Sequence, residues 1–158
     1  MMNTETKLKK DIIYNEEKPT VYLFVCTGNT CRSPMAAAVA NHFLKKRGIV
    51  CESAGLSVPY PAPIAQNALT ALEEMGIEPC EYADYRCHTA RQLNAEIMER
   101  ADRVFGLTDG HNFAILTAFP EYADKISPFG VSIPDPYGGT LDDYIKALSS
   151  IINAVKQF

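Results

Sequence analysis

The stretch that decides the fold is residues 21–33, which read VYLFVCTGNTCRS. Residues 21–26 form an unbroken apolar run of strand length, a pattern typical of a strand that is buried on both faces of a parallel sheet. A polar turn follows, and Ser33 and Pro34 then open a helix, since serine is a good N-cap and proline suits the first helical position. The stretch therefore predicts a buried strand, a short loop and a helix in succession.

The rest of the chain continues this alternation. Further strands are predicted at 49–56, at 104–107 and, as a short segment, near 126–129. Helices are predicted over 64–75, 88–101, 108–116 and 141–155, where most have apolar residues at helical spacing. This order predicts an α/β fold in a single domain, with a doubly wound, four-stranded parallel sheet flanked by helices. Ligands of such sheets bind at the carboxyl ends of the strands, which is where the loop after the first strand lies.

The composition limits the possible functions. The chain has 158 residues, about one domain's worth at roughly 100–200 residues per domain. Its net charge of −4 argues against a nucleic-acid binder, because affinity for a phosphate backbone comes mainly from Lys and Arg. No stretch reaches the ~18 apolar residues of a membrane span, and the first residues lack the apolar core of a signal peptide, so we expect a cytoplasmic protein without a membrane partner. Residues 1–19 are predicted to form a polar extension, and residues 20–158 are predicted to form the folded domain.

The loop after the first strand has the chemistry of a phosphate site. Unpaired backbone N–H groups at a helix N-terminus attract anions, and Gly28 and Asn29 are residue types that tolerate the positive φ needed to curl those amides around one centre. Arg32 adds a planar fork that can bind two phosphate oxygens. Cys26, at the end of the strand, faces the same centre, where the positive field favours its nucleophilic thiolate form. The predicted phosphate contacts are Thr27, Gly28, Asn29, Thr30, Cys31, Arg32 and Ser33.

The alternative for Cys26 is a buried core cysteine, a common fate of that residue type. The five cysteines are odd in number and are not spaced as a disulfide framework. Each is therefore a buried core residue, a metal ligand or a nucleophile. A bare C-x5-R pattern is a weak signal. The strand, the C-x5-R spacing, the Ser-Pro pair and the helix together favour the nucleophile.

The loop and its flanking residues resemble a known protein family. Residues 21–39, VYLFVCTGNTCRSPMAAAV, are similar to the opening of the low-molecular-weight protein-tyrosine-phosphatase family, whose signature places nucleophile, arginine and serine where Cys26, Arg32 and Ser33 stand. The resemblance continues at 53–55 (SAG), 88–93 (HTARQL) and 135–139 (DPYGG), and so covers about residues 20–158. It implies a cysteine-dependent phosphatase acting on phosphorylated proteins or peptides without a cofactor. Residues 1–19 depart from the family, which usually begins close to its first strand.

Asp135 is the predicted general acid and base. A phosphoryl leaving group must gain a proton, and the water that attacks the phosphocysteine must lose one, so one carboxyl group can serve both steps. Asp135 lies in a loop bracketed by Pro134 and Pro136, as in the family's Asp-Pro motif. The alternative is a loop aspartate that merely starts a turn. Tyr137 is predicted to wall the substrate site.

A supporting network is predicted around the loop. Ser33 is expected to donate to the Cys26 thiolate as well as to cap the helix. Asn29, Ser53 and His88 match family positions that form a hydrogen-bonded network, which would hold the loop amides in place.

Two other histidines, His42 and His111, receive no predicted role, and His88 itself could be a surface or core histidine. With no His/Cys cluster at metal-ligand spacing, no metal is predicted.

Two other functions compete with a phosphatase. Thiol-dependent arsenate reductases resemble this family in the phosphate loop but need two further redox cysteines. Cys80 and Cys87 are suggestive, yet the relatives place that pair after the third strand, where residues 104–109 contain no Cys. A catalytically silent phosphate-binding module would be expected to lose Cys26 or Asp135, and both remain.

Two residues of the loop suggest finer properties. Tyrosine-directed family members usually carry an apolar branched residue at the position of Thr30, whereas members that look like protein-arginine phosphatases carry Thr. Thr30 therefore favours phosphoarginine slightly, with phosphotyrosine activity retained, although Tyr137 and Tyr60 suit an aromatic ring. Cys31 lies close enough in sequence to Cys26 to trap its sulfenic acid as a disulfide; the alternative is that Cys31 packs under the loop.

Overall fold

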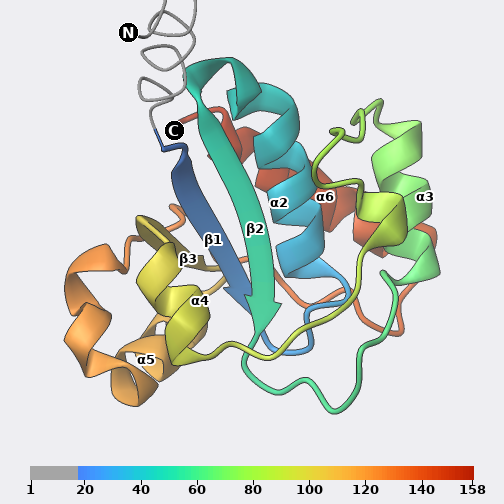
Figure 1. The fold of residues 1–158 in the computed structure, drawn as a ribbon. Helices are drawn as coiled ribbons and strands as arrows, with labels where there is room; N and C mark the ends of the chain where they lie inside the picture. The colour runs from blue at the N-terminus through green and yellow to red at the C-terminus, as the bar shows by residue number, and fades with distance from the viewer. Residues whose placement is uncertain (1–17) are drawn as a thin grey trace, which may run out of the picture.

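The computed structural model describes residues 18–158 and contains one sheet of three parallel strands in the order β2-β1-β3 (Figure 1). The strands are β1 (Thr20–Cys26), β2 (Ile49–Gly55) and β3 (Arg103–Gly106). The predicted extension at 1–19 lies almost entirely outside the described residues. In the described part no helix is long and apolar enough to cross a membrane.

Helices cover both faces of the sheet (Figure 1). One face is covered by α2 (Arg32–Leu44), α3 (Gln66–Glu74) and α6 (Leu141–Val155), the other by α4 (Ala95–Arg100) and α5 (Asp109–Ala118). Short 3-10 turns complete the elements: η1 (Lys45–Arg47), η2 (Tyr85–Cys87) and η3 (Pro120–Lys125).

The apolar run of β1 is what permits this double layer. Tyr22 and Phe24 pack on the α2–α3–α6 side, while Leu23 and Val25 pack on the α4–α5 side, and all four are buried. Successive side chains of a strand point to opposite faces, so a continuous apolar run can serve two cores. The predicted single-domain, doubly wound α/β fold is confirmed.

The predicted fourth strand at 126–129 is wrong. That segment forms only an isolated parallel bridge, between Ile126 and Val104. The ladder stops because the side chain of Asn112 occupies the next pair: its Oδ1 accepts the Gly106 N–H (2.7 Å) and its Nδ2 donates to the Ser127 carbonyl (3.3 Å). Pro128 then follows without an N–H to donate.

The helix predicted over 88–101 is much shorter than expected. Helix α4 starts only after Asn94, whose side chain accepts the N–H of Ile97 at 2.9 Å. Residues 88–93 run extended past the end of β2, where the Gly55 N–H donates to the Arg91 carbonyl (2.9 Å) and the Leu93 N–H donates to the Gly55 carbonyl (2.8 Å). This pairing brings the 88–93 segment against the loop that follows β1.

The last predicted helix is confirmed. Helix α6 begins after Thr140, which forms a capping box with Asp143: each side chain accepts the other's backbone N–H. Asp142 and Asp143 lie in its first turn, as the helix dipole favours. Because this cap follows directly after residues 135–139, it holds that loop at a defined distance from α2, against which α6 packs.

Candidate active site

The loop between β1 and α2 curls around the carboxyl end of the central strand. In the part of the chain that the structure describes, no backbone N–H of residues 27–32 has a hydrogen-bond partner. These residues line a cavity of about 700 Å³ together with Cys26. A set of unpaired amides at a helix N-terminus is an anion-binding arrangement. Of the two residues expected to adopt positive φ, only Asn29 does so (φ 57°); Gly28 does not.

Close approach to β2 shapes the loop. A Cβ added to Gly55 would lie 2.7 Å from the Thr27 carbonyl oxygen and 3.0 Å from the Cβ of Asn29. Any side chain at Gly55 would therefore push the loop away from the strand end. The Ser57 N–H donates to the same Thr27 carbonyl at 3.0 Å, which fixes this approach.

Ser33 lies at the nucleophile rather than at a helix cap. Its Oγ is 3.0 Å from the Cys26 Sγ, and both side chains are buried. A thiolate can only accept, so Ser33 donates to it when Cys26 is ionised. The predicted capping role is wrong, because α2 begins at Arg32 with Cys31 as its N-cap and with no side-chain cap. The helix amides consequently stay free for an anion.

Asn29 is the centre of the predicted network. Its side chain is fully buried, and its Nδ2 donates to Ser33 Oγ (2.8 Å) and to Ser53 Oγ (3.0 Å). His88 Nε2 lies 2.7 Å from the Asn29 carbonyl oxygen, which can only accept, so the proton of the ring is on Nε2. Burial lowers the pKa of His88, which favours this neutral form. The structure thus brings together the three predicted partners of the loop.

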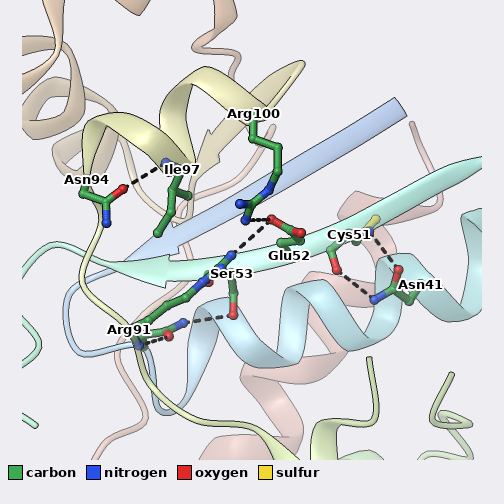
Figure 2. Close-up of polar contacts among 9 residues, drawn as sticks. Asn41, Cys51, Glu52, Ser53, Arg91, Asn94, Ile97 and Arg100 are labelled. Atoms are coloured by element: carbon green, nitrogen blue, oxygen red, sulfur yellow. Dashed lines mark hydrogen bonds and ion pairs between the residues drawn. The ribbon is translucent and has the colours of Figure 1, made fainter. Parts of the chain in front are cut away.

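Arg91 is a further member that the sequence reading missed. Its backbone N–H donates to Asn29 Oδ1 (3.0 Å), and its Nε donates to the Ser53 carbonyl (2.9 Å). Its guanidinium also pairs with Glu52 at 3.1 Å, and Arg100 pairs with the same carboxylate at 2.8 Å (Figure 2). Burial alone would raise the pKa of Glu52, but the two guanidinium groups outweigh it and lower that pKa. These contacts hold the 88–93 segment against β2. The match to HTARQL indicated that this segment matters, but the helix predicted there did not indicate its extended backbone.

Arg32 joins the phosphate loop to the loop of the predicted acid. The guanidinium is buried, and its Nη2 is 3.5 Å from Asp135 Oδ2. Its Nη1 donates to the Ile133 carbonyl at 3.1 Å, and the Ile133 N–H in turn donates to the Leu107 carbonyl just after β3 (2.9 Å). Asp135 is about half exposed and lines the same cavity as Cys26, 109 positions earlier in the chain.

Comparison with known families decides which kind of phosphate site this is. The family model of the low molecular weight phosphotyrosine protein phosphatases matches residues 21–158. The chain belongs to this family. The resemblance read from residues 21–39 and from the later motifs is confirmed.

Individual relatives differ in their named activity. The chain is 37% identical over 136 residues to a protein-arginine-phosphatase of Geobacillus stearothermophilus, covering 82% of this chain and 86% of the relative. It is 31% identical over 143 residues to an arsenate reductase of Bacillus anthracis, covering 90% and 96%. Among solved structures, the YwlE arginine phosphatase variant with a phosphorylated active-site serine superposes with a TM-score of 0.77 at 29% identity, covering 87% of this chain and 92% of that one.

The remaining predicted site residues of this low-molecular-weight phosphatase also line the cavity. Tyr137 and Tyr60 both lie there and are strongly exposed, and Thr30 lines it next to Cys31. The Tyr137 N–H donates to Asp135 Oδ1 at 3.1 Å, so the aromatic wall and the acid share one turn.

Cys31 is held under the loop by a tyrosine. Its Sγ lies 3.4 Å from the Tyr144 hydroxyl and 3.7 Å from Thr30 Oγ1. Burial raises the pKa of the Cys31 thiol, and the hydrogen bonds from Tyr144 and Thr30 offset this only in part. Cys31 is therefore a neutral thiol that lines the same cavity as the nucleophile, and Tyr144, on α6, is a contact that the sequence did not indicate.

His111 also contacts the loop, although the sequence assigned it no role. Its Nε2 is 3.0 Å from Thr27 Oγ1 and its Nδ1 is 3.0 Å from Thr108 Oγ1. Burial, and then the charge of Arg32, lower the pKa of His111 to about 4. The ring is therefore neutral near pH 7. His42, by contrast, accepts the Glu78 N–H (3.2 Å) and does not line the cavity of Cys26.

The other cysteines lie elsewhere. Neither Cys80 nor Cys87 lines the cavity of Cys26, and Cys87 lines a second cavity together with Ser53 and His88. Within residues 18–158, no group of three or more His, Cys, Asp or Glu side chains is placed to hold a metal ion.

Proposed function

We propose that the protein hydrolyses phosphoarginine, and phosphotyrosine as a second substrate, on proteins or peptides through a phosphocysteine on Cys26. The observation that carries this proposal is the convergence of Cys26, Arg32 and Asp135 on one cavity, which is also lined by residues 27–32 with their unpaired backbone amides. The family assignment supports a phosphatase, and the 37% identical arginine phosphatase supports the first substrate.

The first chemical step follows from this geometry. The amides of residues 27–32 and the Arg32 guanidinium bind the phosphoryl oxygens, and they stabilise the charge spread over them in the transition state. The Cys26 thiolate, which accepts a hydrogen bond from Ser33, attacks phosphorus. The bond from phosphorus to the leaving oxygen or nitrogen breaks, and Asp135 protonates that leaving atom.

The second step regenerates the thiolate. Asp135, now a carboxylate, takes a proton from a water molecule, which attacks the phosphocysteine and releases inorganic phosphate. The 3.5 Å contact between Asp135 and Arg32 keeps the carboxyl group at the mouth of the cavity in the free protein.

The substrate preference rests on the rim of the cavity. A guanidinium group has several N–H donors that need acceptors once they are desolvated. Thr30 Oγ1 and the unprotonated oxygen of the Asp135 carboxyl group are two such acceptors on the cavity wall. The exposed rings of Tyr137 and Tyr60 can pack on a phenyl ring or on a guanidinium plane, so they are compatible with both substrates.

Replacing Thr30 by isoleucine should shift the preference towards phosphotyrosine. The change removes an acceptor for the guanidinium and adds apolar surface for a phenyl ring. We expect the ratio of kcat/KM on matched phosphotyrosine and phosphoarginine peptides to rise by at least about tenfold, or about 1.4 kcal/mol of differential transition-state binding. Thr30→Val, which removes the hydroxyl without added bulk, should give part of this shift. An unchanged ratio in both variants would remove Thr30 as the determinant.

The arsenate reductase relatives make arsenate reduction the alternative function. That reaction needs two additional thiols near the nucleophile, and the positions of Cys80 and Cys87 outside the cavity of Cys26 argue against it. Hydrolysis of a chromogenic aryl phosphate, together with the lack of thiol-dependent arsenate reduction, would separate the two functions.

We expect oxidation of the enzyme to be reversible through Cys31. Peroxide converts the Cys26 thiolate to a sulfenic acid, and the Cys31 thiol displaces water from it to form a disulfide that an added thiol can reduce. Both cysteines line one cavity, which supports this pairing. After peroxide treatment long enough to carry an unprotected Cys26 sulfenic acid on to the irreversible sulfinic acid, dithiothreitol should restore most of the activity of the native enzyme and little of that of Cys31→Ser. The matched control is Cys87→Ser, at an exposed cysteine outside the cavity, which should recover fully. Equal recovery in all three proteins would count against the disulfide.

A further inference from the structure

His111 is a buried imidazole that the proposed reaction does not use. It is 7% exposed and lies in the first turn of α5, which follows β3, whereas Ser53 of the Asn29 network lies on β2, on the other side of β1. Its two ring nitrogens have one partner each, Thr27 Oγ1 and Thr108 Oγ1, both at 3.0 Å. The ring therefore forms a direct hydrogen-bonded connection between the N-terminus of α5 and the residue that follows the nucleophile.

His111 is held firmly at the N-terminus of α5. Thr108 caps α5 by accepting the His111 N–H at 3.1 Å, so backbone and ring of His111 are both tied to the cap. A Cβ added to Gly106 would lie 2.8 Å from the Cβ of His111, which shows how closely this turn packs on the end of β3. Gly106 is paired with Val25, one residue before Cys26. The position of the imidazole is thus set by the same sheet that positions the nucleophile.

Thr27 is held by His111 on one side and, on the other, by Ser57, two residues after the end of β2. Its carbonyl oxygen accepts the Ser57 N–H at 3.0 Å, whereas its hydroxyl reaches His111. Without His111, the first peptide units of the loop would be fixed on the β2 side alone. The amide of Thr27 is the unpaired N–H adjacent to Cys26 in the chain, so a small rotation there would move a phosphate donor directly beside the sulfur.

We propose that His111 is a positioning residue for the phosphate loop, which acts through the Thr27 hydroxyl to hold the amide next to Cys26 in place for the transferring phosphoryl group. This inference rests on the proposed phosphatase function. It adds a second set of contacts that holds the phosphate loop in place, separate from the network of Asn29, Ser53 and His88. A neutral ring suits this place, because a cation would lie within the field of Arg32 and would compete with it for Asp135.

The test is a double-mutant cycle between Thr27 and His111. Thr27→Val and His111→Asn each remove the connection, and each should lower kcat/KM on an aryl phosphate by about tenfold. The double variant should lose no more than about tenfold, because the two residues act through one contact. Thr27→Ser, which keeps the hydroxyl, should recover most of the loss. Thr117→Val removes an exposed hydroxyl in the same helix and should behave as the native enzyme.

A second readout keeps the proposal independent of turnover. The dissociation constant of inorganic phosphate, measured as protection of Cys26 from iodoacetate, should rise about tenfold in each single variant and no further in the double variant. A merely structural role predicts instead that His111→Asn lowers the melting temperature and that the two substitutions multiply to about a hundredfold. Multiplying effects, or single variants indistinguishable from the native protein, would overturn the proposal. A native protein that binds phosphate but hydrolyses no phosphorylated substrate would contradict the proposed function and leave this cycle measurable.

Discussion

Cys26→Ser is expected to abolish turnover, with kcat lowered by at least ~10⁴-fold, while anion binding is retained. The serine hydroxyl at this position is a far weaker nucleophile than a thiolate, and an alkoxide is a far worse leaving group in the second step. The groups that bind the anion are unchanged, because the unpaired amides of residues 27–32 and the buried Arg32 guanidinium are not part of the substitution. Isothermal titration with orthovanadate and a steady-state assay on an aryl phosphate measure the two properties separately.

A solved relative suggests a third readout for the same variant. In the arginine phosphatase structure described above, the active-site serine is phosphorylated. If the serine hydroxyl in this chain attacks slowly, mass spectrometry of Cys26→Ser after incubation with substrate should find phosphoserine at position 26 and no multiple turnover. Cys87→Ser is the matched control, since it makes the same atomic change at an exposed cysteine outside the cavity. Sustained turnover by Cys26→Ser would refute the assignment of the nucleophile.

Arg32→Ala completes this comparison, because it should lose both binding and rate. The guanidinium also donates to the Ile133 carbonyl, so its removal frees the loop that carries Asp135. A melting curve should accompany the assay to show that the variant is folded. Together, the two substitutions separate the group that reacts from the group that binds.

The sequence predicted the local elements well where one segment contains all the information. The run 21–26 and the amphipathic stretch 141–155 each carry a complete pattern of apolar residues, and the structure has β1 and α6 there; the cap predicted at Ser33 is the exception. Asp135 could be placed in the site because two flanking prolines and a family motif mark it. In the structure its Oδ2 lies 3.5 Å from Arg32 Nη2, and its role in the reaction remains a prediction.

What the sequence did not indicate depends on contacts between distant segments. No sequence feature near Asn112 indicates that its carboxamide ends the hydrogen-bond ladder of β3. The carboxamide reaches the Gly106 N–H only because α5 packs on Gly106 in the folded protein. Arg91 acts partly through its backbone N–H, which carries no residue-type signal at all. His111 lies 84 residues from Thr27, and a lone histidine in a helical pattern has no feature that distinguishes it from a core residue. In each case a polar side chain or a backbone amide forms a hydrogen bond with a group that is distant in the sequence and is brought near only by the tertiary fold.

Asp135→Asn should lower the rate in a manner that depends on the leaving group. For phosphoarginine or an alkylphenyl phosphate the leaving atom must gain a proton as the bond to phosphorus breaks, and general acid catalysis typically contributes ~10²–10⁴-fold. We therefore expect kcat/KM to fall by about 10²–10³-fold on such substrates. For a dinitrophenyl phosphate, whose leaving group is stable as an anion, the loss of kcat/KM should be much smaller.

The second step provides the internal check on this role. An asparagine cannot take the proton of the attacking water, so phosphocysteine should accumulate even with the good leaving group. Rapid mixing of Asp135→Asn with dinitrophenyl phosphate should then give a burst of dinitrophenol followed by a slow steady state. Asp142→Asn, an exposed aspartate in the first turn of α6 that does not line the cavity, is the matched control and should match the native enzyme in both steps. If all substrates lose rate equally and no burst appears, Asp135 holds Arg32 and the turn at Tyr137 in place but moves no proton.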